Sequence, residues 1–412
     1  MKILNFGSCN IDYVYSMNHI VTVGETARAY NLELFPGGKG LNQSIATARA
    51  GAKIFHAGCV GNDGEMLKRI LEDSGVDVSF LKEVNEKNGH AIIQVSDMGD
   101  NSIFIYPGSN EMITRDFVDE VLKSFSSEDI LLLQNEINDI GYIIEKAHSK
   151  GMCVVFNPSP INEVISKIDL NMISYLILNE VEAREITQID YVDGQLVFFE
   201  EKYPNLKVIL TLGKQGSVML KDGNRIRQEA YKVNAVDTTA AGDTFTGYFV
   251  AGLAQKTEDK TLLNLASTAS AIAVSRKGAA PSIPSIDEVL RALGTLEPNR
   301  IENKPENFKK RLEEYIDNNL KTANVKEVAA HLKYSVIYSG SLVKKLTGQT
   351  FTSLLQERRC MRAAKLLRET DLPISEIIAF VGYENESFFR RKFCEKYGVN
   401  PLEYRKNKDK ED

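Results

Sequence analysis

The feature that most constrains the fold of this chain is the alternation of short apolar runs with longer amphipathic segments over residues 1–293. Apolar runs at 54–60 and 130–134 predict buried strands, and the segments at 65–74 and 140–150 predict helices. Strands that alternate with helices form a parallel sheet with helices on both faces. The sequence therefore predicts an α/β fold for this part of the chain.

Two stretches interrupt this alternation. Residues 90–95 and 102–106 predict a pair of strands with no helix between them, and a stretch near 13–35 also appears β-rich. We expect these strands to form a small separate sheet that packs as a flap over the functional site.

The charge is distributed unevenly along the chain. Residues 301–412 contain 22 Lys and Arg against 17 Asp and Glu, a net of +5, so the formal charge of −6 leaves −11 on the first 300 residues. This asymmetry indicates that only the C-terminal part meets a polyanion. Prolines, asparagines and mixed charge at 294–308 predict a linker. The expected domains are 1–293 and 309–407, with a charged tail at 408–412.

The cysteines and the apolar runs argue against a secreted or membrane protein. None of the five cysteines lies in a CxxC motif or a disulfide-framework spacing, which favours reduced thiols and a cytoplasmic location. The N-terminal apolar run is too short for a signal peptide. No apolar stretch approaches the ~18 residues that a membrane-spanning helix needs, so we expect no membrane partner.

A motif at 237–245, DTTAAGDTF, predicts a phosphate site. Ala240, Ala241 and Gly242 precede Asp243, and the apolar-periodic run that follows predicts a helix. Unpaired N–H groups and the helix dipole make a helix N-terminus attract anions, and small side chains let a phosphate reach the backbone. Asp243 would then be placed to take the proton from an attacking hydroxyl. The alternative is a plain helix cap.

Polar residues also follow several predicted strands, at the edge where open α/β sheets bind ligands. Lys39 and Asn42 come after glycines at a helix start, which suits sugar hydroxyls or a phosphate. A carboxylate near phosphates would hold Mg²⁺ through water. The alternatives for these polar residues are ordinary turn chemistry and acids that are simply exposed. The residues in such positions are Asn10, Asp12, Lys39, Asn42, Glu136, Asn179 and Glu182. The Gly/Pro loop at 276–282 offers carbonyls that would close around an ion, and the alternative there is a plain turn.

Several motifs, in order along about residues 1–293, make this part of the chain resemble the ribokinase-like (PfkB) family of sugar kinases. The main motifs are GGKGLN at 37–42, NEVE at 179–182, DTTAAGDTF at 237–245 and RKGAAPS at 276–282. Three more bring it closest to the ribokinases: NID at 10–12, PGSN at 107–110 and QNE at 134–136. The resemblance implies a Rossmann-like sheet between helices with a β lid, and ATP-dependent phosphorylation of a primary hydroxyl.

The resemblance also implies roles for individual residues. Asp243 matches the catalytic base, and Ala240, Ala241 and Gly242 match the anion hole for the transferred phosphoryl group. The sugar-contacting positions are Asn10, Asp12, Gly38, Lys39, Asn42 and Glu136, together with Asp243. The nucleotide side is Asn179, Thr211, Gly213 and Gly216, and Glu182 is the acid associated with Mg²⁺. The K⁺ loop, which acts mostly through backbone carbonyls, is Asp237, Thr239, Ala273, Arg276, Gly278 and Ser282.

The C-terminal part has a helical pattern throughout. Helices are predicted at 308–319, 325–332, 338–346, 351–369, 374–381 and 385–397, with a turn near 334–335 and with Pro401 ending the unit. Two pairs of short helices joined by a long one are typical of paired helix-turn-helix modules. The alternative is an all-α interaction domain with charged solvent-facing surfaces.

This C-terminal part resembles the DNA-binding domain of the AraC/XylS family of transcription regulators. The resemblance rests mainly on 374–406, with support from KKLTGQTF at 344–351 and RAAKLLRETD at 362–371. It implies two recognition helices in successive major grooves of double-stranded DNA. The first module departs from the pattern at Ser339-Gly340 and around Val336-Ile337. The implied DNA-contacting residues are Lys344, Lys345, Asn385, Glu386, Ser387, Arg390, Arg391 and Lys392.

Together the two resemblances predict a bifunctional protein. The kinase part would convert a sugar, most simply ribose to ribose 5-phosphate, and the C-terminal part would regulate genes in response to the sugar. Lid closure on sugar and nucleotide would act on the second domain through the short linker. The alternatives are a sugar sensor without turnover, a kinase whose C-terminal helices bind protein, and a kinase for deoxyribose, fructose or a nucleoside. A homodimer is compatible with lids of this family, which can pair.

Overall fold

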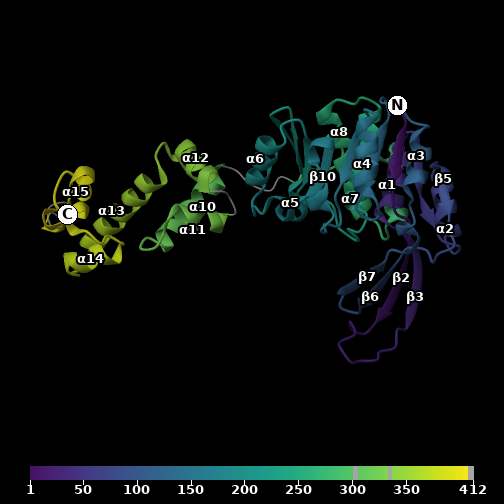
Figure 1. Cartoon of the computed structure of the whole chain (residues 1–412). Coiled ribbons are helices and arrows are strands. Elements are labelled where there is room, and N and C mark those ends of the chain that lie inside the picture. The colour runs from purple at the N-terminus through teal and green to yellow at the C-terminus, as the bar shows by residue number, and fades with distance from the viewer. Residues whose placement is uncertain (300–304, 333–335, 407–412) are drawn as a thin grey trace. The chain divides into compact units, whose positions relative to one another are not determined.

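A computed structural model of the chain describes residues 1–299, 305–332 and 336–406 (Figure 1). The chain divides into two compact units, with the main break at residue 300. We call residues 1–299 the N-terminal unit and residues 305–406 the C-terminal unit. The predicted turn near 334–335 and the predicted tail at 408–412 lie outside the described residues, and so do residues 300–304 of the predicted linker.

The N-terminal unit is built on a nine-stranded sheet in the order β13-β12-β11-β10-β9-β8-β1-β4-β5. The strands from β11 to β5 pair in parallel, which confirms the predicted α/β architecture. The last two strands form an antiparallel hairpin at one edge that the alternation did not predict. The strands are β1 (Ile3–Phe6), β4 (Ile54–Val60), β5 (Asp77–Glu83), β8 (Ile130–Gln134), β9 (Cys153–Asn157), β10 (Tyr175–Asn179), β11 (Lys207–Thr211), β12 (Ser217–Lys221) and β13 (Asn224–Gln228).

Helices cover both faces of this sheet. On one face, Ile3 and Ile54 of the sheet share a buried core with Leu41, Phe249 and Leu262 of the covering helices. On the other face, Phe6 meets Phe117 edge-to-face with ring centroids 6.1 Å apart. The helices of the first face are α1 (Lys39–Arg49), α2 (Glu65–Asp73), α7 (Ala241–Ala254), α8 (Asp259–Val274) and α9 (Ile286–Ala292). The other helices of this unit are α3 (Arg115–Leu122), α4 (Ile140–Ser149), α5 (Glu180–Thr187) and α6 (Val192–Lys202).

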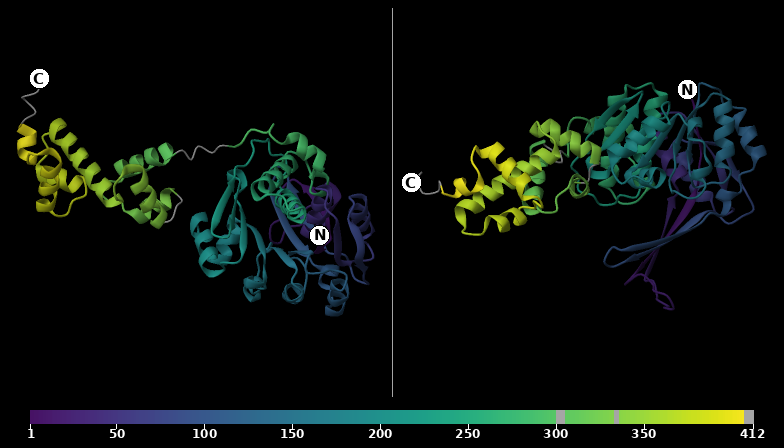
Figure 2. Two further views of the ribbon diagram at one scale, coloured as in Figure 1. Left: turned by 90° about the horizontal axis from the view of Figure 1, so that it is seen from above. Right: turned by 60° about the vertical axis from the view of Figure 1, so that its left-hand side comes forward.

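A second sheet of four strands projects from the N-terminal unit, as Figure 1 and the right-hand view of Figure 2 show. Its order is β3-β2-β6-β7, with β2 and β6 parallel and the outer pairs antiparallel. The predicted flap of separate strands is therefore confirmed. Because β2 follows β1 directly, the residues at the end of the central strand also begin the flap. The strands are β2 (Asn10–Met17), β3 (Asn31–Gly37), β6 (His90–Ser96) and β7 (Asn101–Tyr106).

The C-terminal unit contains only helices among its described residues. The long helix α13 (Phe351–Glu369) connects two separate cores, since Leu354 belongs to the first and Leu367 to the second. The first core is shared by α10 (Pro305–Asn318), α11 (Val325–Leu332) and α12 (Val336–Thr347). The second is shared by α14 (Ile374–Phe380) and α15 (Glu386–Tyr397), with Tyr404 of α16 (Pro401–Lys406) packed against it.

Two details of this unit differ from the predictions. Pro401 does not end the unit but begins α16, because proline fits the first turn of a helix, where its missing N–H is not needed. The pair Ser339-Gly340 does not interrupt α12, and Ser339 is fully buried there. Packing of the same helix into the first core, through Val343, outweighs the poor helix propensity of the pair.

Candidate active site

Asp243 lies in the first turn of α7, and its side chain is buried. Asn42 Nδ2 donates to Oδ2 at 3.1 Å, and Gln43 Nε2 donates to Oδ1 at 2.9 Å. Both amides come from α1, which packs against α7. A carboxylate has about four lone-pair sites, so two amide donors fix its orientation and leave room for a hydroxyl.

The start of α7 offers free backbone donors. The helix begins at Ala241, and its N-cap residue Ala240 supplies no side-chain hydrogen bond. Asp243 does not cap the helix either, because its oxygens are bound by Asn42 and Gln43. Helix N-termini without a side-chain cap present unpaired N–H groups. Here the Ala241 N–H donates to the Thr238 carbonyl at 3.2 Å, which leaves the N–H groups of Gly242 and Asp243 for a ligand. An anion would therefore find a site beside the Asp243 carboxylate.

A second carboxylate, Glu136, lies just after β8. Its Oε2 accepts a hydrogen bond from Ser8 Oγ at 2.5 Å and one from the Lys39 backbone N–H at 2.9 Å. This links the ends of β1 and β8 to the start of α1. The approach needs a glycine at residue 40, because a Cβ there would lie 2.3 Å from the Ser8 nitrogen.

Three carboxylates act on one ammonium group at this site. Burial alone would lower the pKa of Lys39, but the charges of Asp243, Glu136 and Glu182 raise it. Burial raises the pKa of Glu136, although Lys39 and the bonds from Ser8 and the Lys39 amide partly offset it. A buried charge cluster of this kind is characteristic of functional sites.

Asp12 and Asn10 extend the site along β2. Burial, and then the Glu136 charge, raise the pKa of Asp12 to about 7. Asn110 Nδ2 donates to Asn10 Oδ1 at 2.7 Å. Asn42 Oδ1 is buried and has no partner among the described residues. A buried acceptor without a donor suits a ligand hydroxyl, so these residues fit a polyhydroxylated molecule.

The residues expected to contact sugar thus come together, and the structure adds others. Gln43 bonds Asp243 directly, and Gln134 and Asn157 bond Gln43 in turn. Sequence reasoning missed Gln43, although it follows Asn42 in the predicted helix and is a polar residue at a buried position. Asn110 was part of a quoted motif but had no predicted role.

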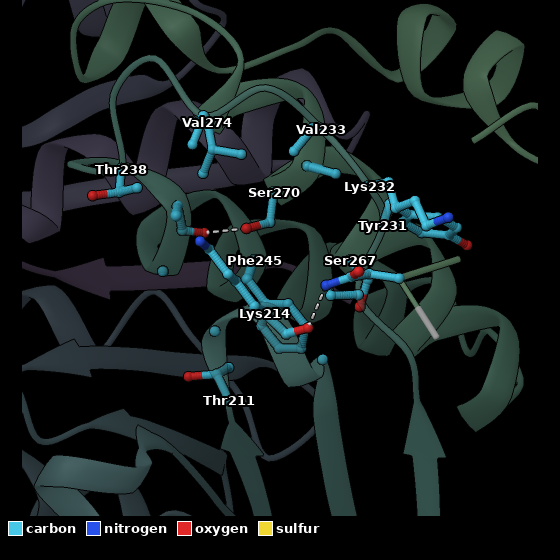
Figure 3. A pocket seen from close by; sticks show the side chains of 18 of the residues that line it. Thr211, Lys214, Tyr231, Lys232, Val233, Thr238, Phe245, Ser267, Ser270 and Val274 are labelled. Carbon is cyan, nitrogen blue, oxygen red and sulfur yellow. Dashed lines mark hydrogen bonds between the residues drawn. The ribbon is translucent and has the colours of Figure 1, made fainter. Parts of the chain in front are cut away.

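On the other side of the start of α7 lies a cavity of about 680 Å³ (Figure 3). It is lined by Thr211, Gly213 and Gly216 after β11, and by Ala241 and Gly242. Ligand cavities commonly have volumes of about 300–1,000 Å³, so a nucleotide fits. In Figure 3, Lys214 and Phe245 lie at the centre, and Ser270 Oγ donates to the Ala241 carbonyl at 3.0 Å. Sequence reasoning did not identify Lys214 or the wall at 230–235.

Gly216 does not need to touch a ligand to be required. Its φ is +89°, and a Cβ there would lie 2.0 Å from the Gln228 carbonyl oxygen. The glycine therefore lets the loop after β11 pass close to the end of β13 and form the cavity wall.

Asn179 and Glu182 form a capping box at the start of α5 and do not line the cavity. Glu182 Oε2 accepts from the Asn179 N–H at 3.0 Å, and Asn179 Oδ1 accepts from the Glu182 N–H at 2.8 Å. Among the described residues, no three or more His, Cys, Asp or Glu side chains gather as a metal-binding group. A Mg²⁺ ion near Glu182 would therefore depend on water and phosphate oxygens, as Mg²⁺ commonly does.

The predicted cation loop comes together around Asp237. Its carboxylate accepts from the Gly278 N–H at 2.9 Å and from the Thr239 N–H at 2.9 Å. Burial alone would raise the pKa of Asp237, but these bonds outweigh it and lower the pKa. The Arg276 side chain is paired with Glu288 at 2.5 Å. Only the backbone carbonyl of Arg276 would therefore be offered to a cation. Ala273 and Ser282 lie buried at the end of α8 and in a short turn at 280–282. Oxygen donors on such a loop fit a monovalent cation.

In the C-terminal unit, the predicted DNA-contacting residues of the second module gather at the start of α15. Asn385 caps this helix by accepting from the Phe388 N–H at 2.8 Å. Arg390 Nε donates to Glu386 Oε1 at 2.9 Å, and Lys392 pairs with Glu395 at 2.7 Å. Ser387, which follows Glu386 in the first turn of α15, is exposed. In the first module, Lys344 is exposed on α12, and the side chain of Lys345 lies outside the described residues.

The described residues contain no helix that is both long and apolar enough to cross a membrane.

Comparison with known proteins gives two family matches. Residues 1–286 match the pfkB family of carbohydrate kinases, and residues 328–407 match a helix-turn-helix domain family of the AraC/XylS type. The chain is 34% identical over 298 residues to the ribokinase of Haemophilus influenzae, a match that covers 70% of this chain and 96% of that protein.

Two solved structures resemble the N-terminal unit. One is the ribokinase of Cryptococcus neoformans var. grubii in complex with ADP, with 32% identity, a TM-score of 0.65, and coverage of 70% of this chain and 99% of that one. The other is the ribokinase of Arabidopsis thaliana with ribose and ATP, with 29% identity, a TM-score of 0.63, and coverage of 71% and 98%.

Proposed function

The chain belongs to the pfkB family of carbohydrate kinases, and from that premise we propose that it phosphorylates the primary hydroxyl of ribose with ATP and regulates transcription in response to the sugar. The observation that carries the kinase part is the Asp243 carboxylate, held by two amides beside an uncapped helix start. Phosphoryl transfer needs positioning, charge stabilisation and a proton acceptor.

In this proposal Asp243 accepts the proton of the attacking hydroxyl. The N–H groups of Gly242 and Asp243 stabilise charge on the transferred phosphoryl group, and the small side chains of Ala240 and Ala241 leave room for it. Lys39 adds a positive charge among the carboxylates. Asn10, Asp12 and Asn42 bind the sugar hydroxyls, together with Gly38 and Glu136. The ribose in the related Arabidopsis structure supports the choice of sugar.

The nucleotide would occupy the 680 Å³ cavity beside the start of α7. Mg²⁺ would bind through water and phosphates near Glu182, where it supplies positive charge to the phosphoryl group. K⁺ would bind on the carbonyls of the loop around Asp237, Thr239 and Gly278. Asn179 would act by shaping α5 through its capping box.

The DNA-binding part of the proposal rests on the two helix pairs joined by α13. The start of α15 would enter a major groove, with Arg390, Arg391 and Lys392 contacting phosphates or guanine. A sugar-responsive regulator requires that ligand binding in the N-terminal unit changes DNA affinity.

We further propose that the flap mediates a homodimer. Its edge strand β7 exposes large apolar side chains, with Phe104 55% and Ile105 53% exposed. Exposed apolar edge strands favour pairing with another chain. We expect Phe104→Glu to shift the protein to monomer. Met98→Glu, at the exposed tip of the flap, should not do so, and analytical ultracentrifugation measures the oligomeric state of both variants.

The test of the kinase proposal is ATP-dependent phosphorylation across pentoses, hexoses and nucleosides. Turnover that is fastest on ribose, and lost in Asp243→Asn with sugar binding retained, is expected because an amide cannot accept the proton. Saturable ribose binding without turnover on any substrate would favour a sensor instead. Faster turnover on deoxyribose, fructose or a nucleoside would reassign the substrate.

A further inference from the structure

The last described residues of the N-terminal unit form part of the wall of the nucleotide cavity. Tyr231 and Pro298 make an antiparallel β-bridge. The Lys232 N–H donates to the Glu297 carbonyl at 2.9 Å, and the Asn299 N–H donates to the Ala230 carbonyl at 2.6 Å. We call residues Glu297–Asn299 the strap. The segment it pairs with, residues 230–232, lines the cavity.

The side chain of Asn299 ties the strap to a second wall. Its Nδ2 donates to the Lys214 carbonyl at 2.9 Å. Lys214 lies between Gly213 and Gly216, the two glycines expected to face the nucleotide, and Asn299 itself lines the cavity. Figure 3 places the Lys214 side chain at the centre of the cavity and Tyr231 and Lys232 at its right-hand side. One asparagine therefore connects the strap to both sides of the site.

The strap lies at the junction of the two units. The match to the pfkB family ends at residue 286, eleven residues before Glu297. Asn299 is separated from the first residue of α10, Pro305, only by residues 300–304. A segment outside the family match thus completes the wall of the cavity and leads directly into the C-terminal unit.

The strap is held weakly enough to open. The described contacts are the backbone bonds, the Asn299 amide and an ion pair of 3.3 Å between the exposed side chains of Lys232 and Glu297. Exposed ion pairs contribute little, and segments with few buried contacts open locally far more readily than a core. A ligand that contacts the closed strap can therefore shift this equilibrium.

We propose that the strap senses the nucleotide and is the route by which nucleotide binding acts on the C-terminal unit. This inference rests on the proposed nucleotide site and DNA binding. A nucleotide in the cavity stabilises the closed strap, which keeps the start of the linker at the cavity wall. Loss of the nucleotide lets the strap detach and lengthens the connection between the units by three residues. The coupling is reciprocal, so a detached strap also weakens nucleotide binding.

The test uses the full chain, ADP and hydrogen exchange measured by mass spectrometry. Each hydrogen bond contributes modestly, so Asn299→Ala is expected to weaken ADP binding about two- to tenfold in calorimetry. Because the coupling is reciprocal, saturating ADP should also slow exchange in peptides that contain 230–232 and 297–299. The KM for the sugar should stay unchanged, because the strap contacts only the nucleotide side.

The control is Asn171→Ala. Asn171 also donates through its side chain, to Asp169 at 2.8 Å, but it lies outside the cavity lining. It should leave ADP affinity and strap exchange unchanged. If wild-type chain binds ADP but strap exchange does not change, or if Asn299→Ala binds ADP normally, the inference is wrong while the kinase proposal stands. Failure of the wild-type chain to bind ADP at all would instead contradict the proposed function.

A second measurement addresses the route to DNA. A duplex selected from a random library by the full chain would be titrated with and without ADP. ADP should change the affinity for this duplex in the wild-type chain and in Asn171→Ala, and this response should be reduced in Asn299→Ala. An unchanged response in Asn299→Ala, or no response in the wild-type chain, would overturn the strap as the route.

Discussion

Gln43 and Asp243 are 200 residues apart in the sequence, yet Gln43 Nε2 donates a hydrogen bond of 2.9 Å to Asp243 Oδ1. The Gln43 side chain is itself held in place, because Gln134 Nε2 donates to its side-chain oxygen, Oε1, at 2.8 Å. Its nitrogen also reaches Asn157 Oδ1 at 3.0 Å. The orientation of the proposed base is thus set by buried amides that connect α1 to the ends of the adjacent strands β8 and β9.

We expect Gln43→Leu to lower kcat by about 10- to 100-fold, because a small misplacement of a catalytic group can cost about that much. The KM for ATP should change little, since Gln43 does not line the nucleotide cavity. Steady-state kinetics measure both. Gln195→Leu is the matched control, because Gln195 is also buried but its side chain donates to the Glu180 and Ile189 carbonyls instead of to Asp243. An equal loss in both variants would indicate general destabilisation instead of a positioning role.

Asp12 should make both stability and sugar binding depend on pH. Its pKa is raised from 3.8 to about 7 in the folded chain, by burial and then by the Glu136 charge. Between these values the folded state holds a proton that the unfolded state has lost, so stability from this group falls as pH rises through that window. The Tm of Asp12→Asn relative to wild type should therefore increase from pH 5 to pH 8.

Sugar binding should change in the opposite sense, because only the ionised Asp12 accepts hydrogen bonds from hydroxyls with both oxygens. Affinity for the sugar in the wild-type chain is expected to fall as pH drops below about 7. Calorimetry at several pH values measures it. A flat profile for binding, together with a constant difference in Tm, would contradict the raised pKa.

The loop around Asp237 should make activity depend on K⁺. Asp237 binds the Gly278 N–H and so shapes the carbonyls proposed to hold the ion. We expect replacement of K⁺ by tetramethylammonium to lower kcat several-fold in the wild-type chain, and Asp237→Asn to respond less to K⁺. Glu258→Gln, which alters a helix cap on α8, should keep the full response. Equal activity in both salts would remove the proposed cation site.

The basic face of α15 should bind the DNA backbone. The guanidinium of Arg391 lies over the Phe388 ring at 5.2 Å, in a largely exposed position. We expect Arg391→Ala to weaken binding to any duplex and to reduce the slope of log affinity against log salt by about one. Lys365→Ala on the connecting helix should have little effect. If both changes act alike, the contribution is one of net charge alone.

The sequence by itself determined the elements and the list of polar groups. The alternation of apolar and amphipathic runs predicted the parallel strands closely, with β4 and β8 at the expected residues. Local periodicity predicts strands and helices because each element buries one face or stripe. The resulting spacing of apolar residues can be read from a short window of sequence. The motif residues around Asp243 were identifiable for the same reason, since loop glycines and helix starts are local features.

Only the tertiary structure decided how these residues act on one another. Neither the contact of Gln43 with Asp243 nor the burial that raises the pKa of Asp12 follows from neighbours in the sequence. The strap was predicted as linker, because its Pro and Asn content is typical of one, yet Asn299 bonds Lys214, 85 residues earlier. Local pattern reports the form of each segment, whereas burial and long-range hydrogen bonds exist only once the sheet has brought distant segments together.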